Sequence, residues 1–98
     1  MLMFSIRARM TQLGIEAPAW AHEMAELVSK KTGVPTRVAT RVGGAQEIVW
    51  VTTYDDFAAF EKAQAVQTDP EYLAKLAEAN AAGLFETTSV ESALWREI

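Results

Sequence analysis

The 98 residues are 50% hydrophobic and 22% charged, a size and composition that fit one hydrophobic core, so we expect a single domain over residues 1–98. The formal net charge of −4 disfavours a binder of the nucleic-acid backbone, which needs a basic face. The absence of cysteine excludes disulfides and thiolate zinc sites, and no apolar run has the length of a signal-peptide core or a membrane span, so we expect a cytoplasmic protein without a membrane partner.

A strand and a helix are predicted first. Apolar and polar residues alternate over residues 2–10, as in a half-buried strand. Apolar residues then recur at helical spacing after Pro18, which predicts a helix. Gly33 can take the left-handed conformation that closes a helix, so this helix should end near Thr32.

Two further strands should form a hairpin. Residues 35–42 alternate again, and a glycine pair at 43–44 is typical of a short turn. The following stretch, residues 47–53, has the β-branched and aromatic density of a buried strand. After it the apolar spacing changes to that of a helix, with Thr53 as the expected cap and Asp56 three residues on.

The second helical stretch should be broken. Thr68 or Asp69 can cap a fresh helix start, with Pro70 in its first turn, so we place a break near residues 67–69. The helix then continues to Gly83. Residues 84–98 are rich in Thr, Val, Leu and Trp and are predicted to form the last strand.

The predicted order β-α-β-β-α-β is the ferredoxin-like α+β fold, a four-stranded antiparallel sheet with its helices on one face. That order, the break at TDPEYLAKL and the closing FETTSVESALWREI resemble the dimeric α/β-barrel superfamily, which includes antibiotic-biosynthesis-type monooxygenases and NIPSNAP-like proteins. The resemblance implies that two protomers join the bare faces of their sheets into a closed barrel. It also implies that any ligand pocket lies between sheet and helices or inside the barrel.

The alternation assigns residues to the two faces of this sheet. We expect the helix-facing side to carry Leu2, Phe4, Ile6, Val38, Val42, Val49, Val51, Val90 and Leu94. The opposite face would carry Arg7, Arg9, Arg37, Arg41, Ile48, Trp50, Thr52, Glu91, Trp95 and Glu97. Two tryptophans on an uncovered sheet would form an exposed apolar patch that marks a partner surface, so we expect a homodimer through this face.

The arginines and the aromatic residues supply the candidate ligand site. Arg7 and Arg9, with arginines from the next strand, can grip an anionic ligand, although salt bridges to Glu47, Glu91 and Glu97 are the favoured alternative. Aromatic strand residues can line a ligand pocket, as in quinol-handling relatives, although packing is their commoner role. The ligand-binding candidates are therefore Arg7, Arg9, Trp50 and Tyr54.

No catalytic or metal site is predicted. His22 is the only histidine and falls off the apolar stripe with Glu26 one turn on, so we expect it at the surface. Asn80 is expected to be partly exposed, and haem-degrading activity is not carried over. RNA-recognition modules share the β-α-β-β-α-β order, but the basic-Gly-aromatic opening of their third strand is absent here.

Two functions of different classes follow from the sequence. The first is a protein without a cofactor that binds a small molecule or serves a structural role. The alternative is a cofactor-independent monooxygenase-like enzyme that acts on a small aromatic or polyketide-type substrate. The absence of an acid/base pair favours the first.

Overall fold

The computed structural model describes all 98 residues, Met1 to Ile98. It confirms the predicted order of elements, with the second helical stretch broken. The strands and helices are β1 (Leu2–Arg9), α1 (Glu16–Thr32), β2 (Thr36–Thr40), β3 (Glu47–Tyr54), α2 (Phe57–Ala63), η1 (Gln64–Thr68), α3 (Pro70–Ala82), η2 (Thr87–Ser89) and β4 (Glu91–Arg96). The two η elements are short 3₁₀ turns.

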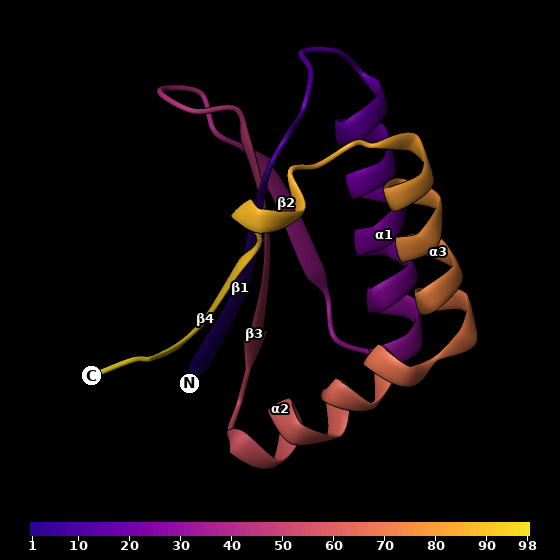
Figure 1. The fold of residues 1–98 in the computed structure, drawn as a ribbon. Helices are drawn as coiled ribbons and strands as arrows, with labels where there is room; N and C mark the ends of the chain where they lie inside the picture. Colours follow the sequence, from indigo (N-terminus) through magenta and orange to yellow (C-terminus); the bar gives the residue numbers. More distant parts are fainter.

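The four strands form one antiparallel sheet in the order β2-β3-β1-β4. All the helices lie on one side of this sheet, and its other side is bare (Figure 1). This arrangement confirms the ferredoxin-like α+β fold. None of the helices combines the length and the apolar composition that crossing a bilayer requires.

The main core lies between the first half of β3 and one face of α1. Ile48 and Ala21 have no exposed surface, and Trp20 and Met24 are more than nine-tenths buried beside them. A smaller core joins Leu2 and Tyr54 at the far end of the sheet to the end of α2. Apolar burial on the helix-facing side of the sheet therefore comes in two separate groups.

The structure reverses the predicted orientation of β3. Ile6 pairs with Trp50 and Ala8 with Ile48, so Ile48, Trp50 and Thr52 face the helices together with the even-numbered residues of β1. Val49 and Val51 face the bare side. The prediction placed the valines inward from the alternation of residues alone, whereas the larger Trp50 buries more apolar surface when it packs on α1.

Two other residues differ from the predicted inward face. Val42 lies beyond the end of β2 and Val90 precedes β4, and both side chains are exposed. The last strand is also shorter than predicted, because the 3₁₀ turn η2 occupies part of residues 84–98. Leu2, Phe4, Ile6 and Val38 lie on the helix-facing side as expected, and so does Leu94, which pairs with Phe4 at the sheet edge.

The helix ends follow local rules. Gly33 has φ 75° and its N–H donates to the carbonyl of Ser29, which closes α1 as predicted. Asp56, not Thr53, caps α2, because its carboxylate accepts from the N–H of Ala59. Asp69 caps α3 through the N–H groups of its first turn, and the Lys31 ammonium lies 3.3 Å from the same carboxylate. The end of α1 is thereby tied to the start of α3.

Candidate functional site

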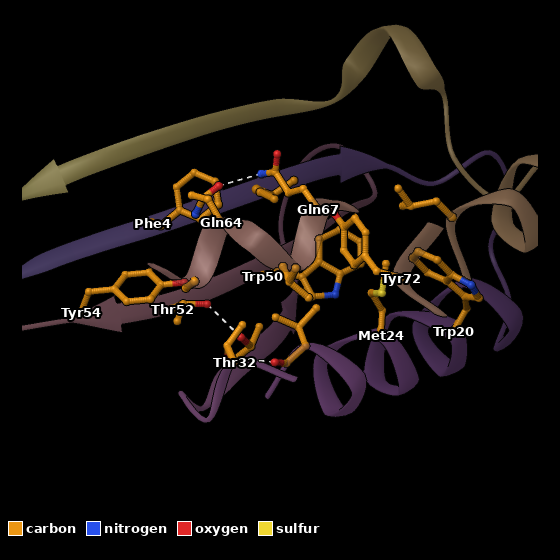
Figure 2. Close-up of a pocket in the computed structure, with 16 residues that line it drawn as sticks. Phe4, Trp20, Met24, Thr32, Trp50, Thr52, Tyr54, Gln64, Gln67 and Tyr72 are labelled. Carbon is orange, nitrogen blue, oxygen red and sulfur yellow. Dashed lines mark hydrogen bonds between the residues drawn. The ribbon is translucent and has the colours of Figure 1, made fainter. Parts of the chain in front are cut away.

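A cavity of about 110 Å³ lies between the sheet and the helices (Figure 2). It separates the two apolar groups of the core, since residues of both line it. The sheet contributes Phe4, Ile6, Thr36, Trp50, Thr52 and Tyr54. Helix α1 contributes Trp20, Met24, Val28 and Thr32. The broken helical stretch contributes Ala63, Gln64, Val66, Gln67, Tyr72 and Leu76.

The two tryptophans of the cavity are fixed by hydrogen bonds to helix backbone. The indole N–H of Trp50 donates to the carbonyl of Ala21 at 3.0 Å, and that of Trp20 donates to the carbonyl of Lys75 at 3.2 Å. The two rings meet edge to face, with centroids 6.1 Å apart. Both N–H groups are therefore satisfied by the protein, and the rings offer a ligand apolar surface.

The cavity carries no charged side chain. Its titratable groups are the phenols of Tyr54 and Tyr72. Burial raises the pKa of Tyr54, with the Thr52 side chain opposing part of the rise, and burial raises the pKa of Tyr72. Both tyrosines are neutral hydrogen-bonding groups near neutral pH.

The size of the cavity limits what it can hold. An apolar cavity of about 150 Å³ holds benzene, whereas pockets for drug-sized ligands span roughly 300–1,000 Å³. The 110 Å³ found here is nearer the first figure. The space suits a single ring and is too small for a fused polyketide skeleton.

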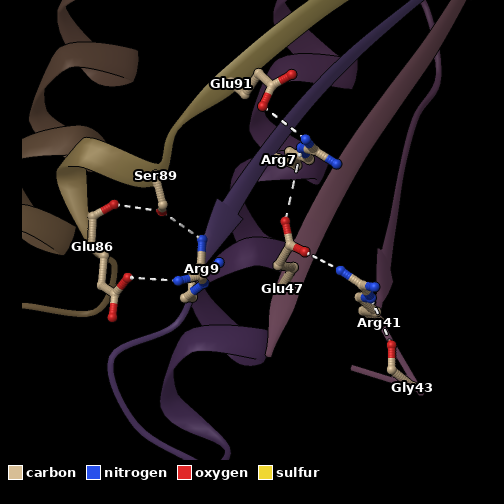
Figure 3. A network of polar contacts seen from close by, with 8 residues as sticks. All are labelled: Arg7, Arg9, Arg41, Gly43, Glu47, Glu86, Ser89 and Glu91. Atoms are coloured by element: carbon tan, nitrogen blue, oxygen red, sulfur yellow. Dashed lines mark hydrogen bonds and ion pairs between the residues drawn. The ribbon is translucent and has the colours of Figure 1, made fainter. Parts of the chain in front are cut away.

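Arg7 and Arg9 lie on the bare face of the sheet, in a network of ion pairs (Figure 3). Arg7 donates to Glu91 at 2.7 Å and lies 3.8 Å from Glu47. Arg9 lies 3.7 Å from Glu86. The salt bridges predicted to Glu47 and Glu91 are thus present within one chain, whereas Glu97 forms no ion pair in it.

Glu47 is the centre of this network. A hydrogen bond from Arg41 at 2.6 Å is the main cause that lowers the pKa of the Glu47 carboxyl. Burial opposes this shift, and the charge of Arg7 adds to it. A carboxylate with a lowered pKa stabilises the fold at neutral pH, and this contribution is lost as the pH falls through the lowered pKa.

The four predicted ligand-binding residues do not form one site. Trp50 and Tyr54 line the cavity, whereas Arg7 and Arg9 lie on the opposite face of the sheet. Their roles in binding stay predictions. The sequence analysis missed the helix-borne part of the cavity wall, notably Met24, Val28, Gln64, Gln67 and Tyr72. The inward stripe of each helix was the signal that could have pointed to Met24, Val28 and Tyr72.

The two lone polar residues of the sequence lie outside the cavity. His22 is exposed and its Nε2 lies 3.0 Å from Glu26, one turn along α1, as predicted. Asn80 is exposed on α3. Neither residue contributes to the cavity.

Comparison with known proteins identifies relatives by structure alone. No protein-family model matches the sequence, and no curated protein matches it. An uncharacterised NIPSNAP domain protein from Burkholderia xenovorans is 17% identical, with a TM-score of 0.75 over 100% of this chain and 95% of that chain. An antibiotic biosynthesis monooxygenase is 12% identical, with a TM-score of 0.72 over 100% of this chain and 99% of that chain.

A mutant of SnoaB, a cofactor-independent oxygenase from Streptomyces nogalater, is 18% identical, with a TM-score of 0.70 over 98% of this chain and 91% of that chain. This chain has the fold of these proteins. The resemblance stated from the sequence is confirmed at the level of fold. TM-scores of 0.70 to 0.75 at identities of 12 to 18% establish the shared fold alone, so activity has to be argued from the residues of the cavity.

The ion-pair network gives a prediction about Glu47. In the variant Arg41→Gln the pKa of Glu47 should rise toward the ordinary value, because the strongest hydrogen bond to its ionised form is lost. The pKa is measured by ¹³C NMR titration of the Glu47 carboxyl carbon. Arg37→Gln is the matched control, since Arg37 lies on the same face without an ion pair. An unchanged Glu47 pKa in Arg41→Gln would show that the network does not form in solution.

Proposed function

We propose that this protein binds a small, uncharged, mainly apolar molecule, about the size of one aromatic ring, in the cavity between sheet and helices. The observation that carries the proposal is an uncharged, aromatic-lined cavity of about 110 Å³ between two halves of the core. A chain of 98 residues has little apolar surface to spare, so space left unfilled there lowers its stability. A ligand that fills it recovers the lost contacts.

The proposal is tested with toluene as the probe. We expect a dissociation constant on the order of 1 mM, or about 4 kcal/mol, which is within reach of a seven-atom ligand. In an NMR titration the indole N–H signals of Trp20 and Trp50 should move, because both rings line the cavity. The signal of Trp95, which lies on the bare face, serves as the internal control.

Two variants control for binding elsewhere on the protein. Val66→Phe places added volume in the cavity and should weaken toluene binding about tenfold or more. Val90→Phe makes the same change at an exposed position outside the cavity and should leave binding unchanged. Equal effects of the two variants, or shifts at Trp95 alone, would contradict the proposal.

A second candidate, cofactor-independent oxygenation of a small aromatic substrate, is favoured by the likeness in fold to SnoaB. Such a reaction needs an ionised substrate that can pass an electron to oxygen. The cavity offers no carboxylate, imidazole or amine to remove the proton, and the raised pKa of each tyrosine makes neither an effective base near neutral pH. The candidate is therefore restricted to substrates that ionise in water.

This restriction predicts the pH dependence of oxygen uptake with small hydroquinones. The rate of oxygen uptake, after subtraction of the protein-free rate, should rise with pH as each hydroquinone ionises. The pH midpoint of this rise should therefore differ between hydroquinones of different pKa. Val66→Phe should abolish the excess, and Val90→Phe should retain it. A midpoint that stays fixed across hydroquinones would indicate a protein base and contradict the restriction, and no excess uptake with any hydroquinone would reject the candidate.

We also propose that two protomers pair through the bare face of the sheet, in the cytoplasm, a location that the cysteine-free composition suits. At one end of this face Trp95 is 57% exposed and Met3, its partner across the strands, is 41% exposed. Val51 and Ala93 flank the next position of β1 on the same face. This apolar patch adjoins the ion pairs of Arg7, so a partner would meet apolar contacts at one end and charges at the other.

The dimer predicts a mass of twice 10.8 kDa by light scattering at micromolar concentration. Trp95→Glu should shift the mass to that of the monomer, because it replaces the largest exposed apolar side chain of the patch with a charge. Val42→Glu, an equally drastic change at an exposed position outside the sheet face, should leave the dimer intact. A wild-type protein that is already monomeric would reject this pairing.

A further inference from the structure

Three hydroxyl groups follow one another along the sheet wall of the cavity. The Oγ1 atoms of Thr36 and Thr52 are 2.9 Å apart and share a hydrogen bond in which either can be the donor. Tyr54 lies two residues further on the same face of β3, and its phenol oxygen lies beside the Thr52 side chain (Figure 2). Thr52 and Tyr54 are 5% and 4% exposed, so both are buried beside the cavity. Figure 2 shows Tyr54 and Thr52 on one side of the cavity.

The hydroxyl chain has one more hydrogen than it can use internally. Three hydroxyls carry three hydrogens, and the two contacts along the chain engage at most two of them. When the two bonds run in the same direction along the chain, the remaining hydrogen lies at one end, on Thr36 or on Tyr54. When it lies on Thr36, the phenol oxygen of Tyr54 can accept a hydrogen bond from a ligand. When it lies on Tyr54, the phenol can donate one.

The Thr36 end of the chain can release its hydrogen to solvent. Thr36 is only partly buried and also borders a surface groove beside His22 and Arg37. Its backbone N–H donates to the hydroxyl of Ser29 at 2.8 Å, and that hydroxyl donates to the carbonyl of Ala25 at 2.7 Å. Thr36 is thus held in place while its own hydroxyl remains free to turn between Thr52 and water.

We propose that the Tyr54, Thr52 and Thr36 hydroxyl chain recognises the single polar group of a neutral ligand, and that by reversing its direction it accepts from a hydroxyl or donates to a carbonyl. This inference rests on the proposed small-molecule binding and narrows its ligand class to one-ring compounds that carry one hydroxyl or carbonyl group. An anion should bind more weakly than a neutral ligand of the same shape, because the cavity has no cation to offset the loss of hydration.

A second polar group of the cavity supplies the matched control. Tyr72 comes from α3, lines the same cavity and is also partly buried, but it has no hydroxyl neighbour in the chain. Gln64 and Gln67 on the same side bond to each other at 2.7 Å. Replacement of Tyr72 by phenylalanine removes a phenol hydroxyl from the cavity without touching the proposed chain.

The test compares phenol, benzaldehyde, benzoate and toluene as ligands in NMR titrations of the 98-residue protein at pH 7. Tyr54→Phe should weaken phenol and benzaldehyde about fivefold to tenfold and leave toluene unchanged, because only the hydrogen bond is lost. Thr52→Val should weaken phenol and benzaldehyde in the same direction, since it interrupts the chain. Tyr72→Phe should leave the affinities of phenol and benzaldehyde, each relative to the affinity of toluene, unchanged. Benzoate should bind more weakly than benzaldehyde.

The outcomes separate this inference from the proposed function. Suppose that toluene binds, but that Tyr54→Phe changes the affinities of all ligands equally or that Tyr72→Phe selectively weakens phenol and benzaldehyde instead. The cavity is then a binding site, but the hydroxyl chain is not the element that recognises the ligand. Benzoate binding as tightly as benzaldehyde would also overturn it. If neither toluene nor phenol binds, the proposed function itself is rejected.

Discussion

The packing of Trp50 on α1, held by the hydrogen bond from its indole to the carbonyl of Ala21, fixes one face of β3 toward the helices. Ala21 is a fully buried residue of α1. Its carbonyl accepts the indole N–H of Trp50 in addition to the backbone hydrogen bond that it accepts within the helix. Once Trp50 is fixed there, the strand's period of two places Ile48, Thr52 and Tyr54 inward as well. The core at one end, the hydroxyl chain at the other and the cavity between them follow from this orientation.

The order of elements was predictable from the sequence because it depends on local patterns. The alternation of residues 2–10, Gly33 at the end of α1 and the Asp69-Pro70 helix start each specify an element without reference to the rest of the chain. The orientation of β3 was not predictable in this way. Residues 48–51 of this strand are apolar on both faces, so hydrophobicity alone cannot choose between two orientations that differ by a shift of one residue.

The candidate site was predicted in part for the same reason. Trp50 and Tyr54 belong to the cavity, but they were grouped with Arg7 and Arg9, which the true register places on the other side of the sheet. The residues from α1 and α3 depend on how three helical segments pack over the sheet. That packing is a tertiary property, and no spacing within the sequence encodes it directly. The sheet therefore separates an uncharged interior site from a charged exterior network.

The break between α2 and α3 carries a consequence for how such a protein can change over time. One wall of the cavity consists of two short helical pieces and the start of α3, while the remaining walls belong to the sheet and α1. Most backbone hydrogen bonds of the sheet do not depend on this segment. Insertions, deletions or new side chains there can enlarge or reshape the cavity while β1, β3 and α1 keep their packing. The fold thus confines adaptation to new ligands to one replaceable segment, so that chains of similar architecture can diverge in what they hold.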